Sequence, residues 1–183
     1  AMDRRQKRRP DLKRRGWQSN QVRFITTLLT AAVMVMIFVL STEDADRSNE
    51  TSGVFSRIVL KVISPRYEQL PKDQQEALFN SVQNVIRKCA HFSEYALLGL
   101  TLRLSLESWF GPGPRKKCGV WSWAGGTLYA CTDELHQMLV DGRSGQMRDV
   151  MIDSSGVLFG TVLAGLLIGK QGKKDAAAPA EEG

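Results

Sequence analysis

The sequence predicts an all-α membrane protein, a bundle of four transmembrane helices with one extracytoplasmic amphipathic helix. An uncharged apolar run lies near the start of the chain, and a second lies near its end. Gly and Pro residues divide the region between them into helical segments. The mean hydropathy of -0.22 over 183 residues hides this pattern. It does so because the polar residues are concentrated at the two ends, which leaves a more apolar middle.

The N-terminal arm, residues 1–23, carries nine Lys or Arg and two Asp. Such an arm alone could bind nucleic acid, because basic side chains neutralise phosphates. Here the uncharged run 24–40 follows at once, close to the ~20 residues that cross a ~30 Å hydrocarbon layer. A basic flank before an apolar run is typical of a segment retained in the cytoplasm. We therefore predict a first span at about 22–40, a cytoplasmic arm and no nucleic-acid partner.

A cleaved signal peptide is the alternative for this region. The basic region is long, and the apolar run exceeds the usual length of a signal-peptide core. The following STEDADRS, residues 41–48, offers no small-x-small cleavage site. We therefore interpret the run as an uncleaved anchor.

The segment VFSRIVLKVI, residues 54–63, follows a polar stretch that we expect to be a loop. Its apolar residues recur at helical spacing while Arg57 and Lys61 lie elsewhere, which predicts a short amphipathic helix. Such a helix could lie in the bilayer surface or pack over the other helices as a lid. Both alternatives place it on the extracytoplasmic side.

Pro65 and Pro71 break the chain before a long helix. Asp73 is a candidate N-cap, with Glu76 three residues further on. The apolar stripe continues from there, so one helix of about 33 residues and about 50 Å enters the membrane. Its second half is the predicted second span, 87–108.

The third and fourth spans are predicted at 120–140 and 150–169. Each alone could be a buried helix of a soluble domain, because neither is a clean apolar run. The basic stretches 115–117 and 170–174 place the loop and the tail on the side of the arm. Both termini are therefore predicted to be cytoplasmic, with residues 170–183 forming a polar tail.

Glycines recur four residues apart in the fourth predicted span, as Gly156 with Gly160 and Gly165 with Gly169. Glycines at this spacing let a neighbouring helix approach closely in lipid. We expect the fourth helix to pack within the bundle. The pattern does not predict an oligomeric state.

Ionisable side chains gather near the outer ends of the second, third and fourth predicted spans. Within each span they are three or four residues apart, so that each set lies on one helix face. Three polar faces at one depth are expected to meet. We call this set the polar layer: Lys88, His91, Glu94, Tyr95, Asp133, Glu134, His136, Gln137, Asp149 and Asp153.

The turn DGRSGQMR, residues 141–148, is short and has Gly142 and Gly145 available for positive φ. It is expected to hold Arg143 and Arg148 over the polar layer. A guanidinium there could bind a carboxylate of the protein, or a phosphate or carboxylate that arrives from outside.

The polar layer favours a functional site, because an ionisable group exposed to lipid costs roughly 2.5–3.5 kcal/mol. Satisfied ion pairs that fix helix register are the alternative. General acid and base catalysis is available, because clustered carboxylates and histidines differ in their affinity for protons. The candidates for catalysis are His91, Glu94, Asp133, His136 and Asp153.

The sequence predicts no cofactor. The five candidates include enough ligands for a zinc-like site, but their spacing matches no HExxH motif, so a divalent metal stays an open alternative. The three cysteines, Cys89, Cys118 and Cys131, have no CxxC spacing and indicate neither a disulfide framework nor a zinc ribbon.

Two blocks of the sequence resemble the VanZ-like proteins. RKCAHFSEYALLGLTL, residues 87–102, is similar to the family's R-K-x-x-H-F-x-E-Y helix. DELHQMLVDGRSGQMRDVMIDSSGVLFG, residues 133–160, is similar to its D-E-x-H-Q block, G-R turn and D-x-x-x-D-x-x-G helix. The stretch after the first span, with Ser41, Ser48 and Ser52, looks like the family's FS-rich segment. The resemblance covers residues 24–169, and the polar positions that match are Arg87, Lys88, His91, Glu94, Tyr95, Asp133, Glu134, His136, Gln137, Gly142, Arg143, Asp149, Asp153 and Gly156.

The predicted topology opens the polar pocket outward, and the resemblance implies a bacterial protein with a role in the cell envelope, which we expect in the cytoplasmic membrane. The family's name derives from a member associated with low-level teicoplanin resistance, so a glycopeptide is one implied partner. A membrane lipid or a lipid-linked cell-wall intermediate is the other. Arg143 and Lys88 are expected to hold the anionic part of such a ligand, helped by the remaining ligand-binding candidates, Tyr95, Glu134, Gln137 and Asp149. A binding protein, a membrane enzyme acting on the same headgroup and a scaffold with a buried ion-pair layer are the three alternatives.

Overall fold

The computed structural model describes residues 19–42, 45–111, 115–139 and 146–177, and its regular structure there is entirely helical. This confirms the predicted all-α class. The elements, in chain order, are α2 (Asn20–Ser41), α3 (Ala45–Ile63), the short 3-10 helix η1 (Tyr67–Gln69), α4 (Lys72–Phe110), α5 (Arg115–Gln137) and α6 (Met147–Ala177).

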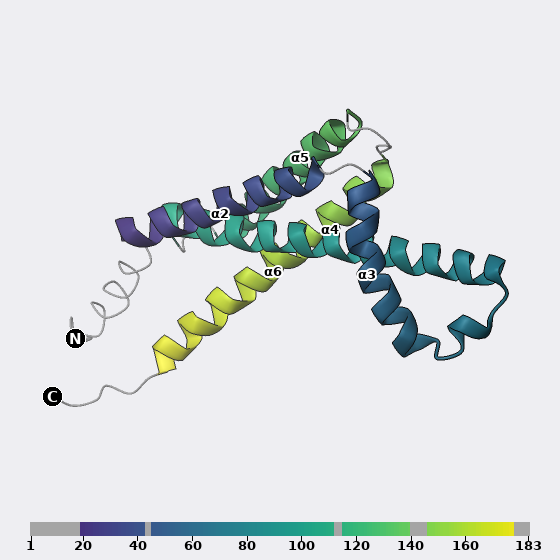
Figure 1. Ribbon diagram of the computed structural model, residues 1–183. Helices are drawn as coiled ribbons and strands as arrows, with labels where there is room; N and C mark the ends of the chain where they lie inside the picture. Colours follow the sequence, from purple (N-terminus) through teal and green to yellow (C-terminus); the bar gives the residue numbers. More distant parts are fainter. Residues whose placement is uncertain (1–18, 43–44, 112–114, 140–145, 178–183) are drawn as a thin grey trace, which may run out of the picture.

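The long helix α4 is the centre of the fold, and it packs against α2, α3, α5 and α6 (Figure 1). The second half of α4 lies among α2, α5 and α6, whereas its first half extends away from them and is crossed by α3. The ends of α2 and α5 lie near the start of α6. The polar positions near those three helix ends are therefore brought to one end of the bundle.

The buried core lies between the second half of α4 and its three neighbours. Tyr95 and Leu98 of α4 are fully buried, and the ring of Tyr95 lies near that of Tyr129 with centroids 6.4 Å apart. The hydroxyl of Tyr129 donates to the carbonyl oxygen of Met34 at 2.7 Å, which ties α5 to α2. The buried hydrophobic residues of this core are Val33, Ile37, Tyr95, Leu98, Ala130 and Val157.

Helices α4 and α6 touch through glycines. A Cβ added at Gly160 would lie 2.7 Å from the carbonyl carbon of Ala96, and one added at Gly156 would lie 3.2 Å from the nitrogen of Ala96. This confirms the close approach predicted for that pair of glycines. The predicted close approach is wrong for the second pair, because an added Cβ at Gly165 or Gly169 meets nothing within 4 Å.

Two helices within the described residues are long and apolar enough to cross a membrane: α2, with a mean hydropathy of 2.4, and Met147–Gly169 of α6, with 1.8. The second half of α4 and helix α5 run beside them but carry more polar residues. Arg103 and Glu107 of α4, for example, are buried between helices. Two of the four predicted spans therefore have the length and hydropathy of a membrane helix.

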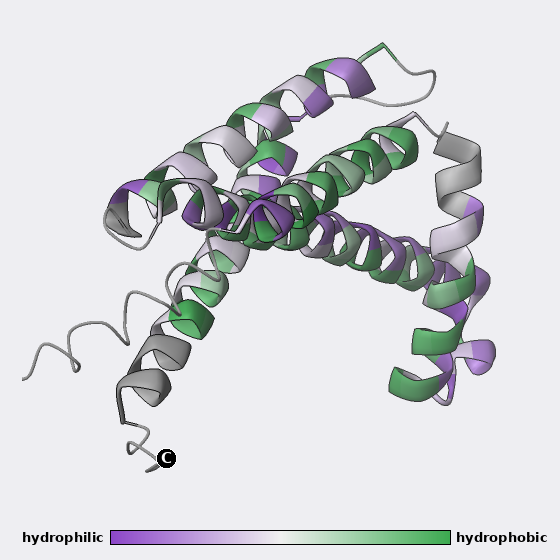
Figure 2. Ribbon diagram, turned by 90° about the vertical axis from the view of Figure 1, so that its left-hand side faces the viewer, coloured by the Kyte–Doolittle hydropathy of each residue, from purple (hydrophilic) through white to green (hydrophobic). Residues whose placement is uncertain are grey.

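The helix before η1 is longer than predicted. It begins at Ala45, so part of the expected polar loop is helical. Its polar residues Ser52 and Ser56 are buried, and Gln83 of α4 donates to the hydroxyl of Ser52 at 3.0 Å. The opposite face is exposed and apolar, which confirms the predicted amphipathic pattern, and Figure 2 shows the second half of α3 as hydrophobic.

Two other helix boundaries differ from prediction. Helix α4 has 39 residues, and its N-cap is Pro71 with no side-chain cap, whereas Asp73 lies in the first turn. Proline fits a helix start because its missing N–H would have no helical partner there. Helix α6 continues to Ala177, beyond the predicted start of the polar tail. Lys, Gln and Ala are good helix formers, so the pattern of hydropathy ends before the helix does.

Candidate functional site

The structure brings the polar layer together at the end of the bundle where α5 ends and α6 begins. Tyr95, Asp133 and Asp153 are 0%, 4% and 1% exposed, although two of them are acidic. Glu134 and Gln137 are also buried. Burial of this kind requires polar partners, because an unpaired buried charge is costly.

Within the described residues, one ion pair and one contact between an imidazole and a carboxyl group connect α4 with α6. The ammonium of Lys88 lies 3.3 Å from a carboxylate oxygen of Asp149. One turn further along, Nδ1 of His91 lies 3.9 Å from a carboxylate oxygen of Asp153. The polar faces of these two helices therefore meet, as the helical spacing predicted.

A second set of contacts joins α5 with α2. The side-chain amide of Gln137 donates to Asp133 at 3.0 Å and to the hydroxyl of Ser41 at 3.2 Å. The hydroxyl of Tyr95 in α4 lies within the electrostatic reach of Asp133 and Asp153. Asp133 thus lies where three helices meet.

Glu134 contacts the start of α6. Its carboxylate accepts a hydrogen bond from the backbone N–H of Gln146, which directly precedes the helix. A negative charge at a helix N-terminus is favourable, because the first backbone N–H groups have no helical partners. Glu134 therefore fixes where α6 begins relative to α5.

The layer is rich in acids. The carboxylate of Asp153 interacts electrostatically with four others, those of Glu94, Asp133, Glu134 and Asp149. Lys88 and His91 are the basic groups that face α6. Clustered carboxylates accept hydrogen bonds, so this arrangement suits ligand groups that donate them, such as hydroxyls, amides and ammonium groups.

Among the buried atoms of the layer that have no hydrogen-bond partner in the described residues are the hydroxyl of Tyr95, Oδ1 of Asp133, Nε2 of His136 and Oδ1 of Asp153. The ring of His136 stacks on Phe38 of α2, with centroids 4.9 Å apart. Buried polar atoms in folded proteins are nearly always hydrogen-bonded. Nε2 of His136 and Oδ1 of Asp133 therefore have capacity for a hydrogen bond with water or a ligand.

Of the five catalytic candidates, the structure pairs His91 with Asp153 and brings Glu94 and Asp133 within electrostatic range of Asp153. His136 lies against Phe38 instead. Across the described part of the chain, no three His, Cys, Asp or Glu side chains are grouped as a metal site. Arg143, together with Gly142 and Gly145, lies outside the described residues, and Arg148 is exposed.

A second polar cluster, near the C-terminal end of α4, was not predicted from the sequence. Arg103 and Glu107 form a buried ion pair with 2.7 Å between nitrogen and oxygen. A basic and an acidic residue four positions apart in an apolar helix were a usable signal for it. Close by, Arg23 of α2 donates to the carbonyl oxygen of Ser108 at 3.2 Å and lies over the ring of Trp109.

The fold and the layer define a class: an all-α protein with two helices apolar enough to cross a membrane and an ionisable layer buried between its helices. A model of the VanZ/LLP1 family matches residues 26–168. The chain therefore belongs to the VanZ/LLP1 family, which confirms the resemblance seen in its two sequence blocks. Membership and the two apolar helices together indicate a membrane protein. No curated protein and no solved structure matches the chain.

Proposed function

We propose that the chain is a multi-pass protein of the bacterial cytoplasmic membrane, with α2, the second half of α4, α5 and α6 as its four spans. Support comes from the shared core, because α4 and α5 bury side chains together with the two apolar helices. Helix α5 also exposes large apolar side chains, among them Val120, Trp121 and Leu128. A lipid environment would cover them. The basic residues before α2 support a topology with both termini in the cytoplasm and the polar layer at the outer boundary.

We further propose that the polar layer binds the headgroup of an amphiphilic envelope molecule. The observation that carries this proposal is the set of buried atoms without a hydrogen-bond partner, among them Nε2 of His136 and Oδ1 of Asp133, beside a group of carboxylates. In a membrane interior such atoms raise the free energy of the protein unless a ligand or water bonds to them. A headgroup rich in hydroxyl or amine groups supplies the missing donors.

Within this proposal each part of the layer has a distinct role. Asp133 accepts hydrogen bonds from the headgroup, and His136 donates or accepts one through Nε2. The pair of His91 and Asp153 forms the floor. Lys88, which pairs with Asp149, holds an anionic part of the ligand, and Arg143, outside the described residues, is the second basic group assigned to this role.

Mass spectrometry of lipids that remain with the purified protein tests this function. The wild type is compared with Asp133→Asn combined with His136→Gln, which keeps the size of both side chains while changing their hydrogen bonding. Arg57→Gln is the control, because Arg57 is exposed on α3, which contributes no residue to the polar layer. We expect one class of envelope lipid to be enriched in the wild type and the control and lost in the double variant. Equal lipid profiles in all three proteins would contradict the proposal.

Catalysis on the same headgroup is a second candidate, favoured by the 3.9 Å approach of His91 to Asp153. A carboxylate that orients an imidazole is a common arrangement for general acid and base catalysis. The test is incubation of purified protein with extracted envelope lipids, with metal analysis of the same sample. A product that the wild type forms and His91→Gln does not form supports catalysis. Lipid that stays bound without any product supports binding alone.

A scaffold role makes a different prediction for the same residues. If the layer serves only to fix helix register, Asp133→Asn lowers thermal stability and cellular function together. A binding site instead loses lipid while the variant stays folded. Low-level teicoplanin resistance, the role associated with the family's name, is tested by comparing the susceptibility of cells that carry the wild type or the double variant.

A further inference from the structure

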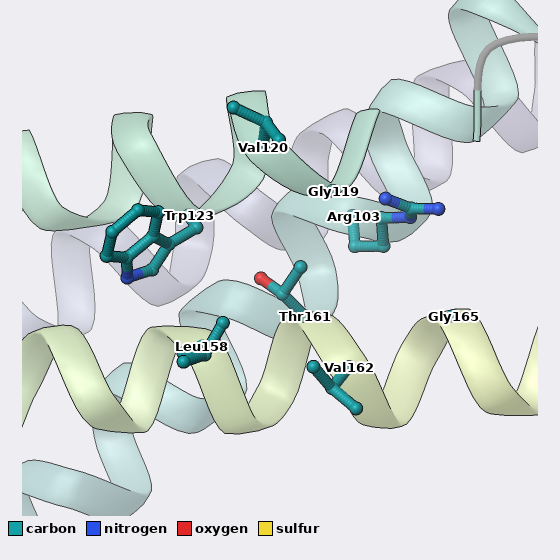
Figure 3. A pocket seen from close by; sticks show the side chains of 8 residues that line it. All are labelled: Arg103, Gly119, Val120, Trp123, Leu158, Thr161, Val162 and Gly165. Carbon is teal, nitrogen blue, oxygen red and sulfur yellow. The ribbon is translucent and has the colours of Figure 1, made fainter. Parts of the chain in front are cut away.

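A cavity of about 540 Å³ lies on the side of the bundle between α5 and α6, with α4 behind it (Figure 3). Its lining includes Gly119 and Trp123 of α5 and Leu158, Thr161 and Val162 of α6. Arg103 of α4 lies at one end. None of these residues belongs to the polar layer.

This cavity is an open groove on the side of the bundle, and its walls are apolar and face outward. Val120, Trp123, Leu158 and Val162 are all exposed, and their positions on two proposed spans put them against lipid chains. The indole N–H of Trp123 donates to the hydroxyl of Ser154 at 3.1 Å, which fixes the ring at the wall. At Gly165 an added Cβ would meet nothing within 4 Å, so the groove is open there.

One end of the groove is polar. Arg103 is 6% exposed, and one guanidinium nitrogen pairs with Glu107 at 2.7 Å. Its Nε has no hydrogen-bond partner among the described residues. Arginine carries five N–H donors, and an ion pair with one carboxylate leaves several of them unused. Gly119 lets the guanidinium reach the groove, because a Cβ there would collide with it.

The polar end lies toward the membrane face opposite the polar layer. Arg103 is close to the end of α4 at Phe110, about 10 Å away at 1.5 Å per residue. Gly119 is one turn from the start of α5, whereas Trp123 lies a turn deeper. Lys117, exposed near the same end of α5, adds positive charge at that face of the membrane. The positive charge at the membrane face suits the phosphate of a phospholipid, and the apolar groove below it suits an acyl chain.

We propose that this groove binds an anionic phospholipid of the cytoplasmic leaflet. One acyl chain lies between α5 and α6 along Trp123 and Leu158, and the phosphate accepts hydrogen bonds from Arg103. The site requires that α5 and α6 span the membrane, but it does not depend on what the polar layer binds.

Quenching of Trp123 by brominated lipids tests the proposal. A variant that keeps Trp123 and carries Phe at the other tryptophans is placed in phosphatidylcholine vesicles. These contain either brominated phosphatidylglycerol or brominated phosphatidylcholine as a minor component. A matched variant keeps only Trp121, which is 68% exposed and lies outside the groove lining.

We expect Trp123 to report phosphatidylglycerol binding about tenfold tighter than phosphatidylcholine, because a hydrogen bond to a charged group contributes about that factor. Trp121 should be quenched equally by both lipids. Equal quenching of Trp123 by the two lipids would overturn the proposal.

Two substitutions locate the bound lipid. Gly165→Leu fills the groove without a backbone conflict and should reduce quenching of Trp123, whereas Gly125→Leu, at an equally open position outside the lining, should not. Unchanged quenching in Gly165→Leu would show that no acyl chain lies there. Arg103→Met with Glu107→Met should abolish the preference for phosphatidylglycerol, and a retained preference would refute the role of Arg103. Asp133→Asn with His136→Gln should leave Trp123 quenching unchanged, which separates this site from the polar layer.

Discussion

Replacing Gly160 by alanine adds a methyl group to the backbone contact between α4 and α6. The new carbon would lie 2.7 Å from the carbonyl carbon of Ala96 and 2.8 Å from the nitrogen of Leu100, well inside an ordinary contact. Both neighbours are backbone atoms of a helix, so neither can rotate away. Helix α6 must therefore move outward from α4.

The expected loss of stability combines two opposing effects. Overpacking against a rigid neighbour costs about 3 kcal/mol, the upper part of the usual range. Alanine regains about 1 kcal/mol over glycine inside a helix. The net loss is then about 2 kcal/mol, which lowers the Tm of a chain of this length by about 4–8 °C.

Gly165→Ala is the matched control on the same helix, because its added Cβ meets nothing within 4 Å. Only the gain in helix propensity applies there, so the Tm should rise by about 2–4 °C. Thermal unfolding of both purified variants in one detergent, followed by tryptophan fluorescence, measures the difference. If Gly160→Ala is as stable as Gly165→Ala, the backbone contact between α4 and α6 is not formed as described.

Three further predictions concern the ion pairs and the start of α6. A double-mutant cycle of Lys88→Gln and Asp149→Asn should give a coupling of at most about 1 kcal/mol in the free energy of unfolding, because both side chains are partly exposed. A coupling near zero would show that the pair is not formed. Arg103→Met should destabilise by about 3–5 kcal/mol by leaving Glu107 buried and unpaired, and Met at both positions should restore most of the loss; no recovery in chemical unfolding would contradict this pairing. Glu134→Leu should cost about 1 kcal/mol and speed amide hydrogen exchange at Gln146, directly before α6, because that N–H loses its acceptor. Unchanged exchange at Gln146 would argue against the contact.

Hydrophobic periodicity predicted the helices well where the buried residues of a helix are also its apolar residues. It missed the first part of α3, because Ser, Asp and Asn compete with the helical backbone for hydrogen bonds. The helix makes a tertiary contact there. Ser52 and Ser56 are buried, and the side-chain amide of Gln83 donates a hydrogen bond to Ser52. No pattern within the segment itself encodes that partner.

The polar layer could be predicted as a set, because the depth of each residue follows from its distance to a helix end. The partners within it could not. Lys88 faces Asp149 and Glu134 faces the start of α6 because the rotation of each helix about its axis is fixed by packing. The glycine contacts of α6 with α4 set that rotation, and glycine spacing alone does not reveal which neighbour is touched.

In the proposed topology the polar layer lies at the outer face of the membrane and the start of α5 at the inner face. Cysteine labelling tests it. The native Cys89, Cys118 and Cys131 are replaced, and single cysteines are introduced at two exposed positions, Gln146→Cys before α6 and Lys117→Cys in α5. In right-side-out membrane vesicles, a membrane-impermeant maleimide should label the cysteine at 146 at once and the cysteine at 117 only after detergent is added. Labelling of 117 before 146, or of both from the same side, would contradict the proposed topology and with it the outward-facing site.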